Sequence, residues 1–343
     1  MTSWRNRKTL ILSRIDMMGL LEPGEYVDCV ETAFRRHGEG RCYLEPKGHI
    51  VLDKYPGEWE IMPSYIEEPA GAGVTEAAAC KWVSIREHNR ARFDLPTVFS
   101  ILVYTEPETG FPLAIVDGSY HTMMRTGASA AVSIRWLARK EASVLALVGA
   151  GDVGAGSLRT CAGVRDWSEV RVWSRTQTTL DAFMASEAPR HPGLALVPST
   201  DLEAVVRGAD AVVTTTTGAA PVVRNEWIAD GTHIAALGSD LAGNQELESA
   251  IAARARIFVD DIRQCVPDGE INVPISEGVI AADDVAGEIG AVICGTLEGR
   301  RDDSEVTLFD STGIAIQDSA TVPLEYQRAV EAGVGIEKKM IST

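Results

Sequence analysis

Three glycines follow a short apolar run with the spacing of a dinucleotide-binding turn. The run Val144–Val148 leads into Gly149, Gly151 and Gly154, and a helix-like segment follows at residues 155–163. Gly149 permits a tight turn, Gly151 lets the backbone approach a pyrophosphate, and Gly154 lets the helix pack close to the strand. The N-terminus of that helix favours phosphate groups. The alternative is a glycine-rich turn without a ligand, and the flanking strand and helix weigh against it.

The next predicted strand decides which nicotinamide cofactor we expect. An Asp or Glu at its end, about 20 residues after the glycines, accepts a hydrogen bond from the ribose of NAD. Here the strand ends in Ser174, Arg175 and Thr176, without an acid. A cation and two hydroxyls suit a 2′-phosphate, so the sequence favours NADP(H), with NAD(H) as the alternative. The alternative for Arg175 is a solvated charge at a strand end.

Hydroxyl groups also lie at the end of a further predicted strand, beside the crevice in which we expect the cofactor to bind. Thr215 and Thr216 follow the apolar run 211–213, where they suit ribose and nicotinamide contacts, although Thr is also a common strand residue. We interpret Asp152 as a helix cap whose side chain turns away from the phosphates. The predicted cofactor-binding residues are Gly149, Gly151, Asp152, Val153, Gly154, Ser174, Arg175, Thr176, Thr215, Thr216 and Thr126.

Two carboxylates are candidates for proton transfer. Asp240 follows the strand 233–237, and ligands of open α/β sheets bind beyond the carboxyl ends of the strands. A turn-forming aspartate is an equal alternative for Asp240. Glu60 lies between Trp59 and Ile61 and is the second candidate.

Three basic residues before the glycines interrupt apolar or small-residue segments. Lys47 precedes a strand, Lys81 lies between Cys80 and Trp82, and Arg125 interrupts a small-residue helix. A substrate carboxylate would satisfy all three, and a surface cation is the alternative for each. The six histidines show no metal-ligand spacing, so we predict no metal site.

Composition limits the class of protein. The chain has 343 residues, and 32 Lys and Arg against 49 Asp and Glu give a net charge of −17. This charge argues against non-specific binding to nucleic acid or to anionic membranes. The six cysteines are scattered, and we find neither a secretory signal nor an apolar run of membrane-spanning length. We therefore expect a cytoplasmic protein with reduced thiols.

The elements that must position these residues fall into two patterns. Residues 9–117 read as several strands with a helix near their start, and residues 120–138 read as a helix. From residue 142 strands and helices alternate, which predicts a doubly wound parallel sheet. A last helix at 316–332 exceeds the needs of that sheet, and we expect it to fold back onto the first segment.

Several ordered motifs resemble the ornithine cyclodeaminase/mu-crystallin family over nearly the whole chain, and within it most closely the archaeal-type alanine dehydrogenases. The motifs are Trp59–Pro63, Cys80–Val83, Thr109–Leu113, Arg125–Ala128, Gly149–Gly151, Gly238–Asp240, Gly269–Asn272 and Phe309–Asp318. The resemblance implies an α/β fold in which a Rossmann domain, residues 131–294, is inserted into an α+β substrate-binding and dimerisation domain, residues 1–130 plus 295–343. It also implies a homodimer.

The resemblance further implies chemistry at the Cα–N bond of an amino acid. In that family, residues matching Lys47, Lys81 and Arg125 hold the substrate carboxylate, and those matching Lys81 and Asp240 serve proton transfer. Glu60 matches the acid that is catalytic in the cyclodeaminase. Ser174–Thr176 is similar to the NADPH-binding ketimine reductase mu-crystallin.

The favoured hypothesis is an NAD(P)-dependent oxidoreductase acting on a small L-amino acid or its imine, in the manner of an alanine dehydrogenase or an imine reductase. One alternative is an ornithine or lysine cyclodeaminase that regenerates its cofactor, which Glu60 favours. The other is a non-catalytic nucleotide-binding protein of the mu-crystallin kind.

Overall fold

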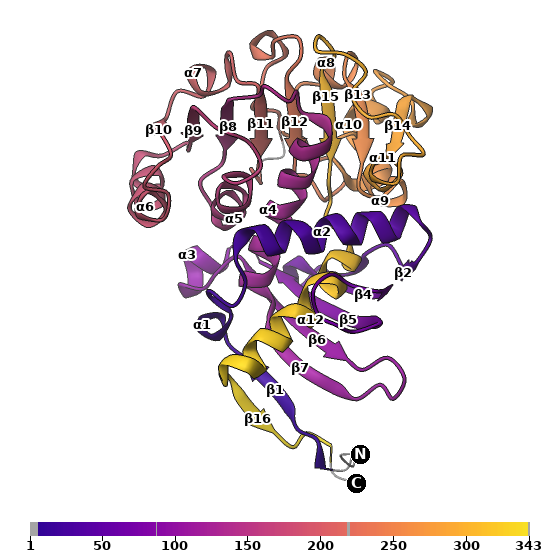
Figure 1. Ribbon diagram of the computed structural model, residues 1–343. Helices are drawn as coiled ribbons and strands as arrows, with labels where there is room; N and C mark the ends of the chain where they lie inside the picture. Colours follow the sequence, from indigo (N-terminus) through magenta and orange to yellow (C-terminus); the bar gives the residue numbers. More distant parts are fainter. Residues whose placement is uncertain (1–5, 87, 218–219, 342–343) are drawn as a thin grey trace. The chain divides into compact units, whose positions relative to one another are not determined.

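The computed structural model describes residues 6–86, 88–217 and 220–341, and it divides into two compact units (Figure 1). Residues 1–122 and 314–343 form unit 1, and the intervening residues 123–313 form unit 2. Helix α4, Gly118–Leu137, begins in unit 1 and continues into unit 2.

Unit 1 is built on an eight-stranded sheet. Seven strands follow the order β16-β1-β7-β6-β5-β4-β2, and β3 pairs with β4. The pairings are antiparallel except that of β1 with β7. The strands are β1 Thr9–Leu12, β2 Cys42–Leu44, β3 Gly48–Leu52, β4 Tyr55–Glu67, β5 Glu76–Ile85, β6 Val98–Thr105, β7 Pro112–Asp117 and β16 Ile336–Lys338.

The helices of unit 1 are α1 Arg14–Met17, α2 Pro23–Gly38, α3 Asn89–Phe93 and α12 Ala315–Ala332. Helix α2 begins at a proline that needs no hydrogen-bond acceptor there, and the capping box of Glu22 and Glu25 closes its start. Helix α12 packs on α2 and on β4 and β5. In β4 and β5 every second residue is buried, so one face of the sheet forms the core with these helices. The last helix therefore returns to the first segment, as the sequence predicts.

Unit 2 contains an eight-stranded sheet in which every pairing is parallel, in the order β10-β9-β8-β11-β12-β15-β13-β14. The strands are β8 Val144–Val148, β9 Glu169–Trp173, β10 Leu196–Ser199, β11 Ala211–Thr214, β12 His233–Ala236, β13 Arg256–Val259, β14 Val285–Glu288 and β15 Thr307–Asp310. The α-helices wholly within this unit are α5 Asp152–Cys161, α6 Gln177–Glu187, α7 Leu202–Val206, α8 Ser249–Ala252, α9 Ile262–Asp268, α10 Asn272–Ser276 and α11 Ile289–Ile293. The direction of winding reverses between the central strands β8 and β11. Sheets of this kind bind ligands beyond the carboxyl ends of the strands at such a switch point.

Glycines bring α4 and α5 into backbone contact. A Cβ added at Gly127 would collide with the backbone of Gly156, and a Cβ added at Gly156 would collide with the carbonyl of Met123. The small residues of α4 around Gly127 thus have a packing role. They let α4 and α5 approach more closely than larger side chains would permit.

The unit boundaries differ from the expected limits of 130 and 294. The substrate domain expected from the sequence includes residues 295–313, whereas β15 lies between β12 and β13 in the parallel sheet. A strand that enters a sheet out of chain order has no local signal, which explains the difference. The short strands β2, β14 and β16 were also absent from the sequence-based prediction. Among the described residues, no helix is long and apolar enough to cross a membrane.

Candidate functional site

The glycine turn joins β8 to α5 with the geometry that a dinucleotide requires. Gly149 has a φ of 125°, which only glycine adopts readily, and its N–H donates to the carbonyl of Trp173. A Cβ at Gly154 would collide with the carbonyl of Gly149. A Cβ at Gly151 would meet no protein atom within 4 Å. This open backbone at the start of α5 fits a pyrophosphate.

One predicted role in this turn is wrong. Helix α5 begins at Asp152, and its N-cap is Gly151, without a side-chain cap. Asp152 is therefore the first helical residue. Its negative charge there stabilises the helix by interacting with the positive end of the helix dipole. Its neighbour Val153 is half-buried.

The end of β9 places Arg175 at the surface. Ser174 is buried, whereas Arg175 and Thr176 are exposed. Thr176 caps α6, because its hydroxyl accepts a hydrogen bond from the N–H of Thr179. The hydroxyl of Thr176 is thus used to cap the helix. Of the three residues, Arg175 is the one whose polar group is exposed and has no role in the cap.

The two threonines after β11 support the loops around the turn. The hydroxyl of Thr215 lies 3.3 Å from the carbonyl oxygen of Gly149. Thr216 donates its N–H and its hydroxyl to Glu246 Oε1. Glu246 Oε2 accepts from the hydroxyl of Thr214 and from the N–H of Gly238. One buried carboxylate thus connects the ends of β11 and β12.

A second buried carboxylate, Glu270, holds the segment that carries Glu246. Glu270 accepts hydrogen bonds from the backbone N–H groups of Glu246 and Leu247. Burial raises the pKa of Glu246, against the lowering effect of its four donors. Burial and the nearby charge of Glu246 raise the pKa of Glu270 well above its ordinary value. Neither carboxylate was identified from the sequence, because no local spacing marks residues that meet across loops.

Asp240 lies in the loop after β12, which is held at several points. A Cβ at Gly238 would collide with the carbonyl of Thr216, so this glycine permits a close approach of two loops. The hydroxyl of Ser239 donates to the carbonyl of Asn244 at 2.9 Å. Asp240 itself is half-buried. This placement at the carboxyl edge of the sheet agrees with the position expected for an acid–base residue.

Arg125 and Thr126 lie in the part of α4 that belongs to unit 2. Both side chains are buried, with exposed fractions of 5% and 8%. A Cβ at Gly313 would collide with the guanidinium of Arg125, so Gly313 makes room for it. A guanidinium so little exposed to water requires anionic or carbonyl oxygen partners.

In unit 1 Lys81 lies in the middle of β5 and is completely buried. Its ammonium donates to Asp318 Oδ1 at 3.1 Å and lies 3.0 Å from Oδ2. Met62 is the direct register partner of Lys81, and Val83 is that of Glu60. Because alternate residues of a strand share a face, Glu60 and Lys81 lie on the same face of the sheet.

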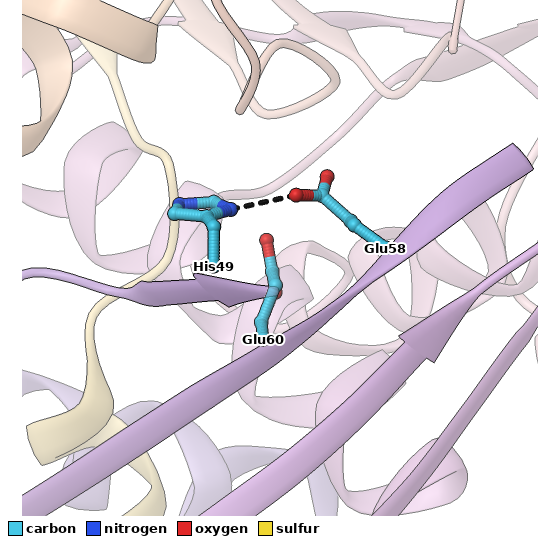
Figure 2. A group of neighbouring side chains, drawn as sticks. All are labelled: His49, Glu58 and Glu60. Carbon is cyan, nitrogen blue, oxygen red and sulfur yellow. Dashed lines mark hydrogen bonds and ion pairs between the residues drawn. The ribbon is translucent and has the colours of Figure 1, made fainter. Parts of the chain in front are cut away.

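A second polar group lies on β3 and β4. Lys47 Nζ is 3.6 Å from Glu60 Oε1, and both side chains are at most 7% exposed. His49 is the register partner of Glu60, and its Nδ1 is 2.7 Å from Glu58 Oε2. Figure 2 shows the side chains of His49, Glu58 and Glu60 turned toward one another.

The ligand atoms of His49, Glu58 and Glu60 lie within 4.8 Å of one another, a separation that a metal ion could bridge. Of these three residues the sequence singles out only Glu60, because His49 and Glu58 meet it through strand register. The ammonium of Lys47 already supplies a positive charge beside Glu60. A divalent cation placed there would be repelled by Lys47, so charge balance does not require one.

The chain matches the model of the ornithine cyclodeaminase/mu-crystallin family over residues 7–333. It is 37% identical to the alanine dehydrogenase of Archaeoglobus fulgidus over 332 residues, which cover 97% of this chain and 98% of that protein.

Two solved structures resemble it over their full extent. An archaeal alanine dehydrogenase dimer with bound NAD has a TM-score of 0.89 and 37% identity, covering 97% of this chain and 100% of the other. The Thermococcus litoralis Δ1-pyrroline-2-carboxylate reductase, in complex with NADH and L-proline, has a TM-score of 0.89 and 30% identity, with coverages of 96% and 99%.

Proposed function

The chain belongs to the ornithine cyclodeaminase/mu-crystallin family, and from this premise we propose that it is an NAD(P)-dependent oxidoreductase that interconverts a small L-amino acid and its imine. The glycine turn carries this proposal. It offers an open backbone at a helix N-terminus beside the central strand of a parallel sheet. Similar chains with this architecture are named as a dehydrogenase and a reductase of such substrates.

A nicotinamide cofactor bound at this turn would accept a hydride from Cα of the amino acid, or return one to the imine. In our proposal Lys47, Lys81 and Arg125 bind the substrate carboxylate, which orients Cα. Lys81 and Asp240 move protons to and from the amine nitrogen and the attacking water. Burial of Lys81 and Arg125 strengthens their attraction for a carboxylate, because little water competes for them.

The test is a spectrophotometric screen of the purified protein. L-amino acids, with NAD⁺ or NADP⁺, and cyclic imines, with NADH or NADPH, are offered in turn. We expect at least one of these substrates to change the nicotinamide absorbance at a rate proportional to enzyme concentration. Absence of any substrate-dependent change across the panel, in protein that binds a nicotinamide cofactor, would refute the proposal and favour a non-catalytic binding protein.

We further propose that NADP(H) is preferred over NAD(H). The support is Arg175, an exposed cation at the end of β9, in a segment without the acid that would repel a 2′-phosphate. The two solved relatives contain NAD or NADH, so a direct measurement on this chain is needed. We expect Arg175→Ala to weaken NADPH binding about tenfold, the loss of one charge-assisted hydrogen bond, and to leave NADH binding unchanged.

The matched control for that titration is Arg190→Ala, which removes another exposed arginine of unit 2. Binding is followed by nicotinamide fluorescence. Equal loss of NADPH and NADH affinity in Arg175→Ala, or tighter binding of NADH than of NADPH by the unaltered protein, would contradict the proposed preference.

A cyclodeaminase is the second candidate, and the group at β3 and β4 favours it. Glu58 and Glu60 are buried carboxylates near His49, and they could accept a hydrogen bond from the side-chain ammonium of ornithine or lysine. Mass spectrometry after incubation with either diamino acid separates the two reactions. A saturated cyclic amino acid (proline or pipecolic acid) formed with ammonia release and no net cofactor reduction indicates the cyclodeaminase, whereas a 2-oxo acid or the cyclic imine derived from it, with stoichiometric cofactor reduction, indicates the dehydrogenase.

We also propose a homodimer formed through the outer face of the unit 1 sheet. The register partners Trp82 and Ile101 are 43% and 52% exposed, and Tyr43 is 63% exposed on the same face. Exposed apolar patches of this kind mark association surfaces. The archaeal alanine dehydrogenase that this chain resembles is described as a dimer.

A further inference from the structure

Lys81 is one end of a buried chain of polar side chains that extends through unit 1. Asp318 of α12 contacts Lys81 and also lies 3.2 Å from Nε2 of His121 in α4. His121 Nδ1 is 2.7 Å from Glu325 Oε2, and Tyr26 of α2 donates its hydroxyl to Glu325 Oε1 at 2.9 Å. We call Lys81, Asp318, His121, Glu325 and Tyr26 the buried relay.

The buried relay is shielded from solvent and balanced in charge. Each of its five side chains is at most 1% exposed. Burial alone would lower the pKa of His121, but the carboxylates Glu325 and Asp318 outweigh it and raise the pKa to about 9. An imidazolium ion can donate from both ring nitrogens, one to each carboxylate, whereas a neutral imidazole can donate from only one. Two cations and two anions therefore alternate along the relay.

The groups that face His121 or its two carboxylates come from four elements. They are Asp318 and Glu325 of α12, Tyr26 and Cys29 of α2, Lys81 of β5 and the neighbouring Tyr120 of α4. Cys29 and Tyr26 are held neutral, because burial and the charge of Glu325 raise their pKa values. The alternation of charges thus depends on Lys81, His121 and the two carboxylates.

We propose that His121 and Glu325 are positioning residues that set the proton affinity and orientation of Lys81 through Asp318. The positive charge of His121 draws on the same carboxylate oxygen that Lys81 contacts, so Asp318 holds the ammonium less tightly than an undivided carboxylate would. Lys81 can then release its proton and act as a base on the substrate amine. This inference rests on the proposed function for its kinetic consequence, and on the geometry of unit 1 for the charged state of His121.

The first test is kinetic. In the fitted pH profile of kcat/KM, the acid limb reports the protonation of the base. His121→Gln removes the competing charge, so we expect the acid limb to move about one pH unit higher and kcat at pH 7 to fall about tenfold. KM and the affinity for the cofactor should change less than twofold. The double variant His121→Gln/Glu325→Gln keeps the relay balanced in charge and should move the acid limb in the same direction, so the test remains available if the single variant does not fold.

Tyr26→Phe is the matched control, since it removes a hydrogen bond to Glu325 and keeps all four charges. Its pH profile should match that of the unaltered protein even if its melting temperature falls. Superimposable profiles for the folded His121→Gln or double variant and the unaltered protein would overturn the proposal, as would an equal displacement in Tyr26→Phe.

The second test does not depend on turnover. Long-range ¹H–¹⁵N NMR of the imidazole nitrogens of His121 should show both nitrogens protonated at pH 7.5, and His121→Gln identifies the signals. A neutral imidazole at that pH would refute the relay whatever the enzyme assay shows. A protonated imidazole in a protein without oxidoreductase activity would instead refute the proposed function and leave the charged relay in place.

Discussion

Lys81 is a lysine without exposed surface in the middle of a strand, and the structure supplies the reason that it can be charged there. Asp318 lies within 3.1 Å of its ammonium, and His121 shares that carboxylate. An unpaired ammonium in this position would be unstable, because burial strongly disfavours an isolated charge. Lys81 therefore combines full burial with an available counter-ion, which is the environment of many acid–base residues.

Removal of the ammonium should stop the reaction without affecting cofactor binding. We expect Lys81→Met to lower kcat/KM at least 100-fold, as proton-transfer groups commonly contribute factors of 100 to 10,000. The cofactor dissociation constant, measured by nicotinamide fluorescence, should stay within twofold. Lys54→Met, which removes an exposed lysine from the turn between β3 and β4, is the control. Turnover near that of the unaltered protein in Lys81→Met would exclude this lysine from the chemistry.

The charge of His121 also predicts a pH dependence of stability. An unfolded histidine has a pKa of about 6.5, and that of folded His121 is raised to about 9. A raised pKa means that the folded state holds the proton more tightly. The stabilisation is therefore complete below pH 6.5, declines as the pH rises to 9, and is absent above it.

We expect the free energy of unfolding of the unaltered protein, minus that of His121→Gln, to fall by about 3 kcal/mol between pH 6 and pH 9.5. Urea titrations at several pH values measure this difference, and the subtraction removes the contribution of groups common to both proteins. A difference that stays constant with pH would show that His121 does not change its charge upon folding.

The sequence identified residues whose local surroundings are unusual and overlooked those defined by distant partners. Lys81 could be recognised because a lysine between Cys80 and Trp82 contradicts the pattern of a buried strand. His121 and Glu325 lie in ordinary helical sequence, and their roles arise from contact across 204 positions. Glu246, which connects Thr216 and Gly238, was overlooked for the same reason.

Among the elements of the fold, β8, the glycine turn and α5 are predicted by sequence signals that all lie within about 20 consecutive residues. The apolar strand and the three glycines predict them, and the structure agrees. Strand β15 has comparable apolar character, but its place between β12 and β13 follows from a crossover that the sequence does not show. Strands β2 and β16 have only three residues each, too few for a periodic pattern.

The contact between α4 and α5 predicts a substitution that would be mild in an isolated helix. Replacing glycine by alanine inside a helix ordinarily stabilises it by about 1 kcal/mol. At Gly156 the added Cβ would collide with the carbonyl of Met123 in α4. Overpacking of this kind costs about 1–3 kcal/mol, so we expect Gly156→Ala to destabilise unit 2.

Differential scanning calorimetry of Gly156→Ala measures the effect. Gly163→Ala is the control, because an added Cβ at this position just after α5 would meet no atom within 4 Å. A melting temperature for Gly156→Ala equal to or above that of the control would show that the helices can separate at no cost.

At the scale of the whole molecule, association should depend on the outer face of the unit 1 sheet. We expect Ile101→Lys to convert a dimer into monomers, because a charge placed opposite the exposed Trp82 cannot be buried in an apolar interface without a partner. Sedimentation velocity measures the change, with the exposed Val197→Lys of unit 2 as the control. A dimer that persists in Ile101→Lys would place the interface elsewhere.

Hydride transfer between the Cα of an amino acid and a nicotinamide is the step on which the proposed function depends. The most direct measurement uses an active L-amino acid that carries deuterium at Cα, with analysis of the cofactor and of released ammonia by mass spectrometry and enzymatic assay. We expect one deuterium in each reduced nicotinamide and one ammonia for each 2-oxo acid formed. Reduced nicotinamide that lacks deuterium would contradict hydride transfer from Cα. Ammonia release while the cofactor stays oxidised and takes up no deuterium would contradict it as well.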